Sequence, residues 1–322
     1  MLRKRLGIDI GTKQISICSM DDGLLLREPS VAAVDIDTNE VVAAGNHALR
    51  AVEANPAKLR LCWPVWDPVV KSAKILSEML RIFLRHAVGR TFLKPRIMVA
   101  IPCDLTDAQS SAVAKAVLAA GASDVQLLEV PLCAALGVGF DFSSPVGQLV
   151  VHVGASRTEV AMIFLGEMVT HLTIPVGGTQ FDSAIIEHMR KRHGIYIGKR
   201  TAEQIKIRIG TVAKAAEEKK LDVKGRCMRT NESHVVTVSS KEMLGAFMEP
   251  LTAILDAVIS VIEQTGDDMR ADIAKTGVML TGGALLAGMD KFLDEVMGLR
   301  VRRAANAETA AVEGAVVALS RL

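Results

Sequence analysis

The sequence predicts an α/β fold in which one structural plan is used twice. The chain runs from short strands into an alternation of helices and strands, and the same order returns in its second half. Each half also opens with an apolar strand, a glycine turn and a second strand. These segments are "LGIDIGTKQIS" near the start and "VVHVGASRTEV" from Val150 to Val160. At 322 residues, the chain is long enough for two such domains.

Composition argues against several classes of function. The net charge is only +2, so no basic surface for nucleic acid is predicted. Aromatic residues make up 3% of the chain, which leaves few platforms for stacked bases. The five cysteines are scattered without a CxxC pair, which is typical of reduced, packed thiols and not of a disulfide frame or zinc site.

The N-terminal apolar run ends at Asp9 and is too short for a signal peptide. No apolar stretch is expected to reach the ~18 residues that a membrane-spanning helix needs. We therefore expect a cytoplasmic protein that can still touch a membrane surface.

The first half is expected to begin with strands. The segments "LGIDI", "ISICSM", "LLLREPSVAAVDI" and "EVVAAG" are rich in β-branched residues and separated by turns. The prolines of "CWPVWDP" are expected to exclude a regular element there. Residues 71–86 show the 3.6-residue period of an amphipathic helix. "RIMVAIP" and "VQLLEV" are predicted strands, and the helix between them has a capping box at Thr106 and Gln109 and ends at Gly121.

The second half repeats this order. "LVVHVGASRTEVAMIFLG" and "MVTHLTIPVGG" predict another strand meander, followed by a helix over residues 181–192 that ends at Gly194. Thr201-x-x-Gln204 is expected to cap the helix "AEQIKIRIGTVAKAAEE". After the strands "RCMRT" and "HVVTV", Ser239-x-x-Glu242 opens a long helix, kinked at Pro250. "GVMLTGG" is a predicted strand, and two helices finish the chain.

The first hairpin has the residues of a phosphate site. A strand that ends Asp-x-Gly-Thr can direct backbone N–H groups and the Thr hydroxyl at a phosphate, while the carboxylate holds hydrated Mg²⁺. Here these residues are Asp9, Gly11 and Thr12. One such hairpin is a weak signal, but two facing hairpins can enclose a polyphosphate.

Two further motifs fit a nucleotide, although each has an ordinary structural explanation. Gly282-Gly283 lie before a helix expected near Ala284, where a ligand can approach the backbone; the alternative is a tight strand–helix turn. Glu203 and Lys206 lie one helical turn apart. This spacing fits either ligands of the ribose and base or an ordinary surface ion pair.

Together these motifs resemble the actin-like ATPases, and specifically the bacterial actin family MreB. "GIDIGT", "REPSVAAVD", "KPRIMVAIP", "VPLCAALGVG", "IPVGGTQFD", "IGKRTAEQIKIRIG", "VKGR" and "LTGGALLAGMDKFL" follow the family order over essentially the whole chain. The resemblance implies duplicated ribonuclease H-like domains around a nucleotide cleft. Domain I would be residues 1–140 plus 304–322, and domain II residues 141–303, with small subdomains at about 29–67 and 179–233.

The resemblance also implies the site residues. Asp9 would hold Mg²⁺ through water. Phe92 and Leu93, flanked by cations, would contact an anionic membrane, or would instead cap the core. ATP would be bound by Gly11, Thr12, Lys13, Gln14, Gly154, Ala155, Ser156, Glu203, Gln204, Lys206, Gly282, Gly283 and Ala284.

The second hairpin departs from the family pattern Val-Asp-Ile-Gly-Gly-Gly-Thr-Thr. His152 replaces the acid, and a neutral imidazole cannot hold hydrated Mg²⁺ as a carboxylate does. Ala155 and Ser156 replace two glycines, so their side chains should push the turn away from a phosphate. Arg157 replaces the first threonine, and it either contacts a phosphate or fills the site.

The family's water-orienting glutamate corresponds to Val130, which leaves no catalytic residue. Glu129 is one residue earlier and should point to the opposite face of its strand. Because phosphoryl transfer needs positioned charge and a positioned water, we expect ATP binding with impaired hydrolysis, at most a weak actin-type ATPase.

The expected role is that of a filament subunit at the inner face of the cell membrane, which maintains rod shape and guides wall synthesis. Its partners would be further copies of itself, an anionic membrane surface, other MreB-type subunits and the wall-synthesis machinery, but no nucleic acid. The main alternative is a pseudo-ATPase that co-assembles with a competent MreB. An actin-superfamily chaperone-type ATPase would need an appended substrate domain, and a small-molecule kinase would need a spare acid other than Glu159.

Overall fold

The structure is a computed structural model that describes residues 3–66, 69–89, 93–213 and 218–321. The chain divides into two compact units. The first comprises Met1–Pro145, Phe164–Met168 and Ala304–Leu322, and the second comprises Val146–Ile163 and Val169–Arg303. Each unit is built on its own five-stranded sheet.

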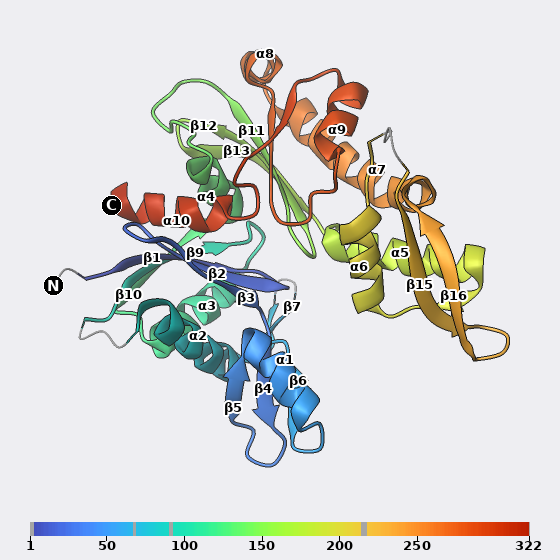
Figure 1. Ribbon diagram of the computed structural model, residues 1–322. Helices are drawn as coiled ribbons and strands as arrows, with labels where there is room; N and C mark the ends of the chain where they lie inside the picture. Colours follow the sequence, from blue (N-terminus) through green and yellow to red (C-terminus); the bar gives the residue numbers. More distant parts are fainter. Residues whose placement is uncertain (1–2, 67–68, 90–92, 214–217, 322) are drawn as a thin grey trace. The chain divides into compact units, whose positions relative to one another are not determined.

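The sheet of the first unit has the strand order β10-β9-β1-β2-β3 (Figure 1). Its strands are β1 (Arg5–Ile10), β2 (Gln14–Ser19), β3 (Gly23–Pro29), β9 (Arg96–Ile101) and β10 (Asp124–Glu129). β1, β2 and β3 are antiparallel, whereas β9 runs parallel to β1 and β10 parallel to β9. Both faces of this sheet are covered, which explains why its central strands are almost continuously apolar.

Helices cover the two faces of the first sheet. Leu6 and Ile8 of β1 pack with α2 and α3, whereas Gly7 between them faces α10. The helices are α1 (Gly45–Ala54), α2 (Ala73–Val88), α3 (Asp107–Ala120), α4 (Val130–Gly137) and α10 (Ala310–Arg321). The predicted amphipathic face of α2 is buried, and both arms of the predicted capping box of α3 are formed.

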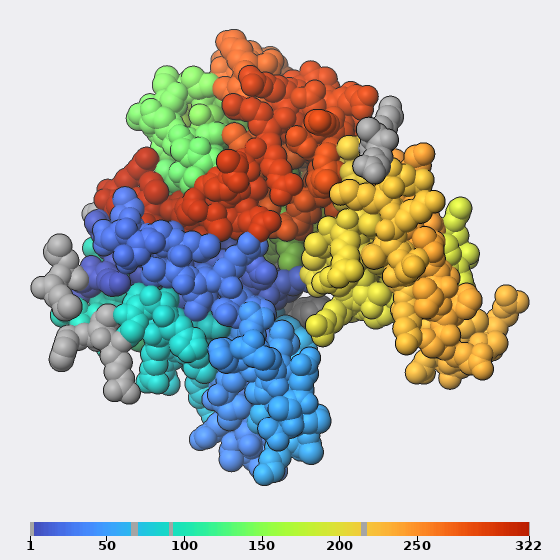
Figure 2. Space-filling model, in the orientation of Figure 1, coloured from blue at the N-terminus to red at the C-terminus, as the bar shows by residue number. Residues whose placement is uncertain are grey.

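A small sheet, β5-β4-β6, protrudes from the first unit as the pale blue lobe in Figure 2. It consists of β4 (Ala32–Asp35), β5 (Val41–Ala44) and β6 (Leu59–Cys62). The short strands β7 (Val65–Trp66) and β8 (Val69–Val70) form a separate ladder. The expectation that prolines exclude regular structure here is therefore wrong. Pro64 lies between strands, where its missing N–H costs no ladder bond.

The second unit repeats the first topology with the order β13-β12-β11-β17-β18. Its strands are β11 (Gln148–Val153), β12 (Thr158–Phe164), β13 (Glu167–Ile174), β17 (Val278–Thr281) and β18 (Val301–Arg303). An antiparallel meander is again followed by two strands parallel to its first strand. The predicted duplication is thus confirmed, although the three-residue β18 was not anticipated.

The remaining elements of the second unit include five helices and a small sheet, among the residues described. They are α5 (Gly178–His193), α6 (Lys199–Ile209), α7 (Ser240–Gln264), α8 (Asp267–Thr276), α9 (Met289–Met297), β14 (Ile195–Tyr196), β15 (Lys220–Cys227) and β16 (Ser233–Ser239). The predicted cap at Thr201 is wrong, because α6 begins at Lys199 after Gly198 and stops at Ile209 before Gly210. α8 was not anticipated.

α7 is the one helix of the described chain that is long and apolar enough, by length and composition, to cross a membrane. The expectation that no stretch reaches this length is wrong by that measure. Several of its side chains, among them Phe247, Leu251 and Ile254, are fully buried in the core of the second unit. Such burial is typical of a core helix.

Candidate functional site

The first candidate hairpin joins β1 to β2. The Gly11 N–H donates to the Gln14 carbonyl at 3.0 Å and closes a turn that contains Thr12 and Lys13. Asp9 is the penultimate residue of the preceding strand β1, opposite Ser16. Burial raises the pKa of Asp9 to about 6, and the nearby charge of Arg27 only partly offsets this. A poorly solvated carboxylate of this kind would gain from a hydrated cation, so Asp9 fits its expected role.

The second candidate hairpin is joined to the start of α5. The Gly154 N–H donates to the Arg157 carbonyl at 2.8 Å, which closes the turn. The N–H groups of Gly178 and Thr179 then donate to the carbonyls of Gly154 and Ala155, at 3.0 and 2.7 Å. The hairpin therefore satisfies the first N–H groups of α5, and Arg157 in the same turn is buried.

His152 occupies the position of the family's second acid. Its Nδ1 lies 3.1 Å from the Thr281 hydroxyl on the neighbouring strand β17. Burial lowers the pKa of His152 from 6.5 to about 4, so the imidazole is neutral near pH 7. A neutral ring bonded to a hydroxyl does not fit hydrated Mg²⁺ on the side of the second hairpin.

Lys206 of α6 lies at the centre of a group of elements in the second unit. Its Nζ is 2.7 Å from the Asp182 carboxylate and donates to the Gly178 carbonyl at 2.8 Å. A Cβ added at Gly178 would lie 3.0 Å from the Ala284 Cβ and 3.3 Å from this Nζ. The start of α5, α6 and the 282–284 turn thus meet closely around a cation, and the small residues Gly178 and Ala284 allow this approach.

The Gly282 turn needs a glycine. Its φ is +100°, and a Cβ would lie 2.2 Å from the Val153 carbonyl oxygen. The Ala284 N–H donates to that same carbonyl at 3.1 Å. The helix expected near Ala284 instead begins at Met289, so the helix N-terminus beside this turn belongs to α5.

Val130 is the first residue of α4, and Glu129 is its N-cap. The argument that Glu129 points away by strand alternation is therefore wrong, because β10 ends at Glu129. Val130 is 6% exposed and belongs to a cluster with Met98 and Cys133. A buried isopropyl group offers no hydrogen bond to a water.

Two other expected site residues, Gln204 and Leu93, are exposed. Gln204 is exposed and lines a pocket between α6 and β15, together with Arg208 and Leu221. Leu93 is 43% exposed, while Phe92 lies outside the described residues. Asp182 was not predicted as a site residue, although it stands in the quoted segment "IPVGGTQFD".

Comparisons with known proteins agree with the resemblance that the sequence motifs indicate. The family model described as MreB/Mbl protein matches residues 3–322. The chain is 35% identical over 308 residues to the cell shape-determining protein Mbl of Bacillus subtilis (strain 168), covering 95% of this chain and 92% of that relative. It is 34% identical over 329 aligned positions to the cell shape-determining protein MreB of Escherichia coli (strain K12), covering 100% and 95%.

Two solved structures are similar over nearly the whole chain. MreB5 of Spiroplasma citri bound to ADP has a TM-score of 0.91 at 27% identity, covering 99% of this chain and 97% of that chain. A MamK double helical filament has a TM-score of 0.84 at 15% identity, covering 100% of each chain, and shows the fold alone. The predicted actin-like fold is therefore confirmed.

Proposed function

The chain belongs to the MreB/Mbl family, and on this basis we propose that it is a subunit of a cytoskeletal filament that maintains cell shape. The names of the relatives support this role. They do not favour the alternatives, a pseudo-ATPase regulator or a chaperone-type ATPase. Assembly with further copies of itself and guidance of wall synthesis belong to the same proposal.

The subunit binds adenine nucleotide at the second-unit group around Lys206. Structures of MreB5 of Spiroplasma citri bound to ADP and to AMPPNP support nucleotide as the ligand. The observation that matters most is the convergence of Lys206, Gly178 and Ala284 at the N-terminus of α5. The Lys206 amine supplies positive charge at this point, which an anionic ligand needs. Gly11 and Thr12 of the first hairpin are proposed as phosphate ligands on the first unit.

Hydrolysis is impaired in this subunit. ATP supplies a γ-phosphate whose cleavage requires positioned charge and a positioned water. Val130 is buried and apolar, and His152 is neutral and bonded to Thr281. Asp9 is the buried acid that would hold a hydrated cation beside the first hairpin.

Calorimetry with ATP and Mg²⁺ tests nucleotide binding. We expect measurable heat and thermal stabilisation of the parent protein. Gly178→Val should weaken binding at least tenfold, because its side chain enters the space beside Lys206 and Ala284. Gly245→Ala is the control, since nothing lies within 4 Å of a Cβ there. Absence of heat and of stabilisation at millimolar ATP in the parent would refute binding.

The subunit also contacts an anionic membrane through the loop that contains Leu93. Leu93 is exposed and is followed by Lys94, and an apolar residue beside a cation suits the surface of an anionic bilayer. A position at the inner face of the cell membrane belongs to the same proposal.

A further inference from the structure

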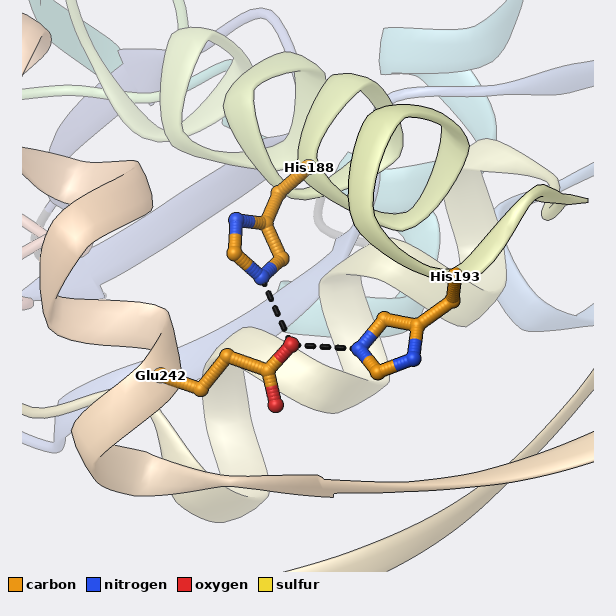
Figure 3. Close-up of side chains that lie close together, drawn as sticks. All are labelled: His188, His193 and Glu242. Carbon is orange, nitrogen blue, oxygen red and sulfur yellow. Dashed lines mark hydrogen bonds and ion pairs between the residues drawn. The ribbon is translucent and has the colours of Figure 1, made fainter.

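Two histidines and a glutamate of the second unit converge at the end of α5 opposite to Gly178. His188 and His193 lie on the last two turns of α5, and Glu242 lies on the first turn of α7. Figure 3 shows both imidazole rings directed at one carboxylate oxygen of Glu242. Nothing in the proposed filament or nucleotide site requires this cluster.

The distances in this cluster are short. The His188 Nε2 lies 2.7 Å from Glu242 Oε1, and the His193 Nε2 contacts the same oxygen. One ligand atom from each of the three residues lies within 4.8 Å of the other two. The side chains of His188, His193 and Glu242 are 19%, 18% and 14% exposed, so water or an ion can reach them.

Local structure explains why these side chains meet. Gly194 adopts a left-handed conformation and ends α5 immediately after His193. Ser239 caps α7, because its hydroxyl accepts from the Glu242 N–H at 3.3 Å. In a capping box the Glu242 carboxylate would bond back to the Ser239 N–H. Here its Oε1 instead contacts the two imidazoles of α5.

We propose that His188, His193 and Glu242 bind a divalent transition-metal ion of the zinc class. Imidazole nitrogens with one carboxylate oxygen form a usual zinc ligand set, whereas Mg²⁺ and Ca²⁺ prefer oxygen ligands alone. Tetrahedral ligands around zinc lie about 3.4 Å apart, so side-chain shifts of roughly 1 Å would admit the ion. Water completes the coordination, and the ion links the end of α5 to the start of α7.

The charges around the cluster suit a cation, with one competitor. The Glu242 carboxylate lies against both imidazoles, and a carboxylate beside two imidazole nitrogens can offset part of a cation's charge. Arg192 Nε lies 3.4 Å from the same oxygen, but its side chain is 69% exposed and can turn into solvent. Removing this arginine should strengthen metal binding.

Metal titration of untagged, chelator-treated protein tests the proposal, without nucleotide or Mg²⁺. We expect one Zn²⁺ per chain by calorimetry, a higher unfolding temperature with Zn²⁺, and the strong visible absorption of four-coordinate Co²⁺. His188→Gln and His193→Gln should each weaken Zn²⁺ binding by about 100-fold or more. His234→Gln is the matched control, since His234 is exposed on β16 of the same unit.

The outcomes separate a metal site from a plain hydrogen-bond network. Zn²⁺ binding by the parent no stronger than by the His188→Gln/His193→Gln double variant would overturn the proposal. Arg192→Gln changes only an exposed side chain, so its fold is not in question, and it should bind Zn²⁺ a few-fold more tightly. Weaker binding by Arg192→Gln would also count against the site. Because nucleotide is absent, failure here leaves the proposed filament function untouched.

Discussion

At the scale of single residues, His152 makes stability depend on pH. Its pKa falls from 6.5 in the unfolded chain to about 4 in the fold, because burial disfavours the charged ring. As pH falls below 6.5, the unfolded chain takes up a proton before the folded one does. Stability is therefore unaffected above about pH 6.5 and declines down to about pH 4, by at most about 3 kcal/mol.

Replacing His152 with a residue that does not titrate should remove this decline. We expect His152→Asn to lose less stability than the parent between pH 7 and pH 4.5, measured by urea unfolding at both values. Asparagine retains a polar group toward Thr281. His234→Asn, at an exposed position, should follow the parent. Equal losses in parent and His152→Asn would show that His152 titrates normally.

Because Val130 and His152 replace two acids of the family pattern, we expect slow ATP turnover. Steady-state phosphate release by the parent should be close to background. Val130→Glu alone should change little, because the acid of the second hairpin is still absent. Adding His152→Asp, Ala155→Gly, Ser156→Gly and Arg157→Thr should give measurable turnover. Rapid phosphate release by the parent that is lost in Asp9→Ala would contradict impaired hydrolysis.

At the scale of elements, α10 depends on close backbone contact with α4. A Cβ at Gly314 would lie 1.7 Å from the Cys133 carbonyl oxygen, and one at Gly137 would lie 1.9 Å from the Ala310 oxygen. We expect Gly314→Ala to lower stability by about 1–3 kcal/mol, because the helices must separate. Gly245→Ala, in open space within α7, should instead stabilise by about 1 kcal/mol. Thermal unfolding tests both, and equal signs would contradict this packing.

We expect the loop before β9 to be needed for membrane binding. Phe92→Ser with Leu93→Ser should abolish co-sedimentation with anionic liposomes, because it removes apolar side chains that can enter the bilayer. Leu118→Ser on α3 is the control, as Leu118 is similarly exposed, at 45% against 43% for Leu93. Undiminished pelleting of the double variant would mean that this loop does not hold the protein on the membrane.

Elements with strong local signals were predictable from the sequence, and those set by distant contacts were not. The period of α2 and the capping box of α3 depend on near neighbours, and both were confirmed. The start of α6 was missed because Gly198, and not Thr201, is its extended cap residue. In the candidate site, Lys206 was expected, but its partner Asp182 stands 24 positions earlier on another helix.

The His188–His193–Glu242 cluster also could not be predicted from local sequence signals. His188 and His193 are five positions apart on α5, a spacing that does not place them on one helix face. Glu242 follows 49 positions after His193, and locally it looks only like part of a helix cap. Their meeting depends on how α5 packs against α7, which no local pattern records.

At the scale of the whole molecule, the two units show how a duplicated fold can diverge at its site. Both retain the same strand order and the same Gly-turn hairpin. In the first hairpin the acid Asp9 pairs with Ser16 on the next strand. His152 stands at the matching position of the second hairpin, where it pairs with Glu159 on the next strand. The fold tolerates this exchange because the ring is bonded to Thr281 and stays neutral.

This divergence leads to a prediction about filaments. Cleavage of a bound nucleotide normally switches such a subunit between states, so a subunit that does not cleave ATP should remain in one state. Filaments of the parent should therefore persist equally long with ATP and with AMPPNP. The variant that combines Val130→Glu with the four hairpin substitutions should disassemble faster with ATP than with AMPPNP. Light scattering after dilution and electron microscopy on anionic liposomes measure this. Parent filaments that shorten with ATP but persist with AMPPNP would show that the site is competent after all, and that neither Val130 nor His152 prevents cleavage.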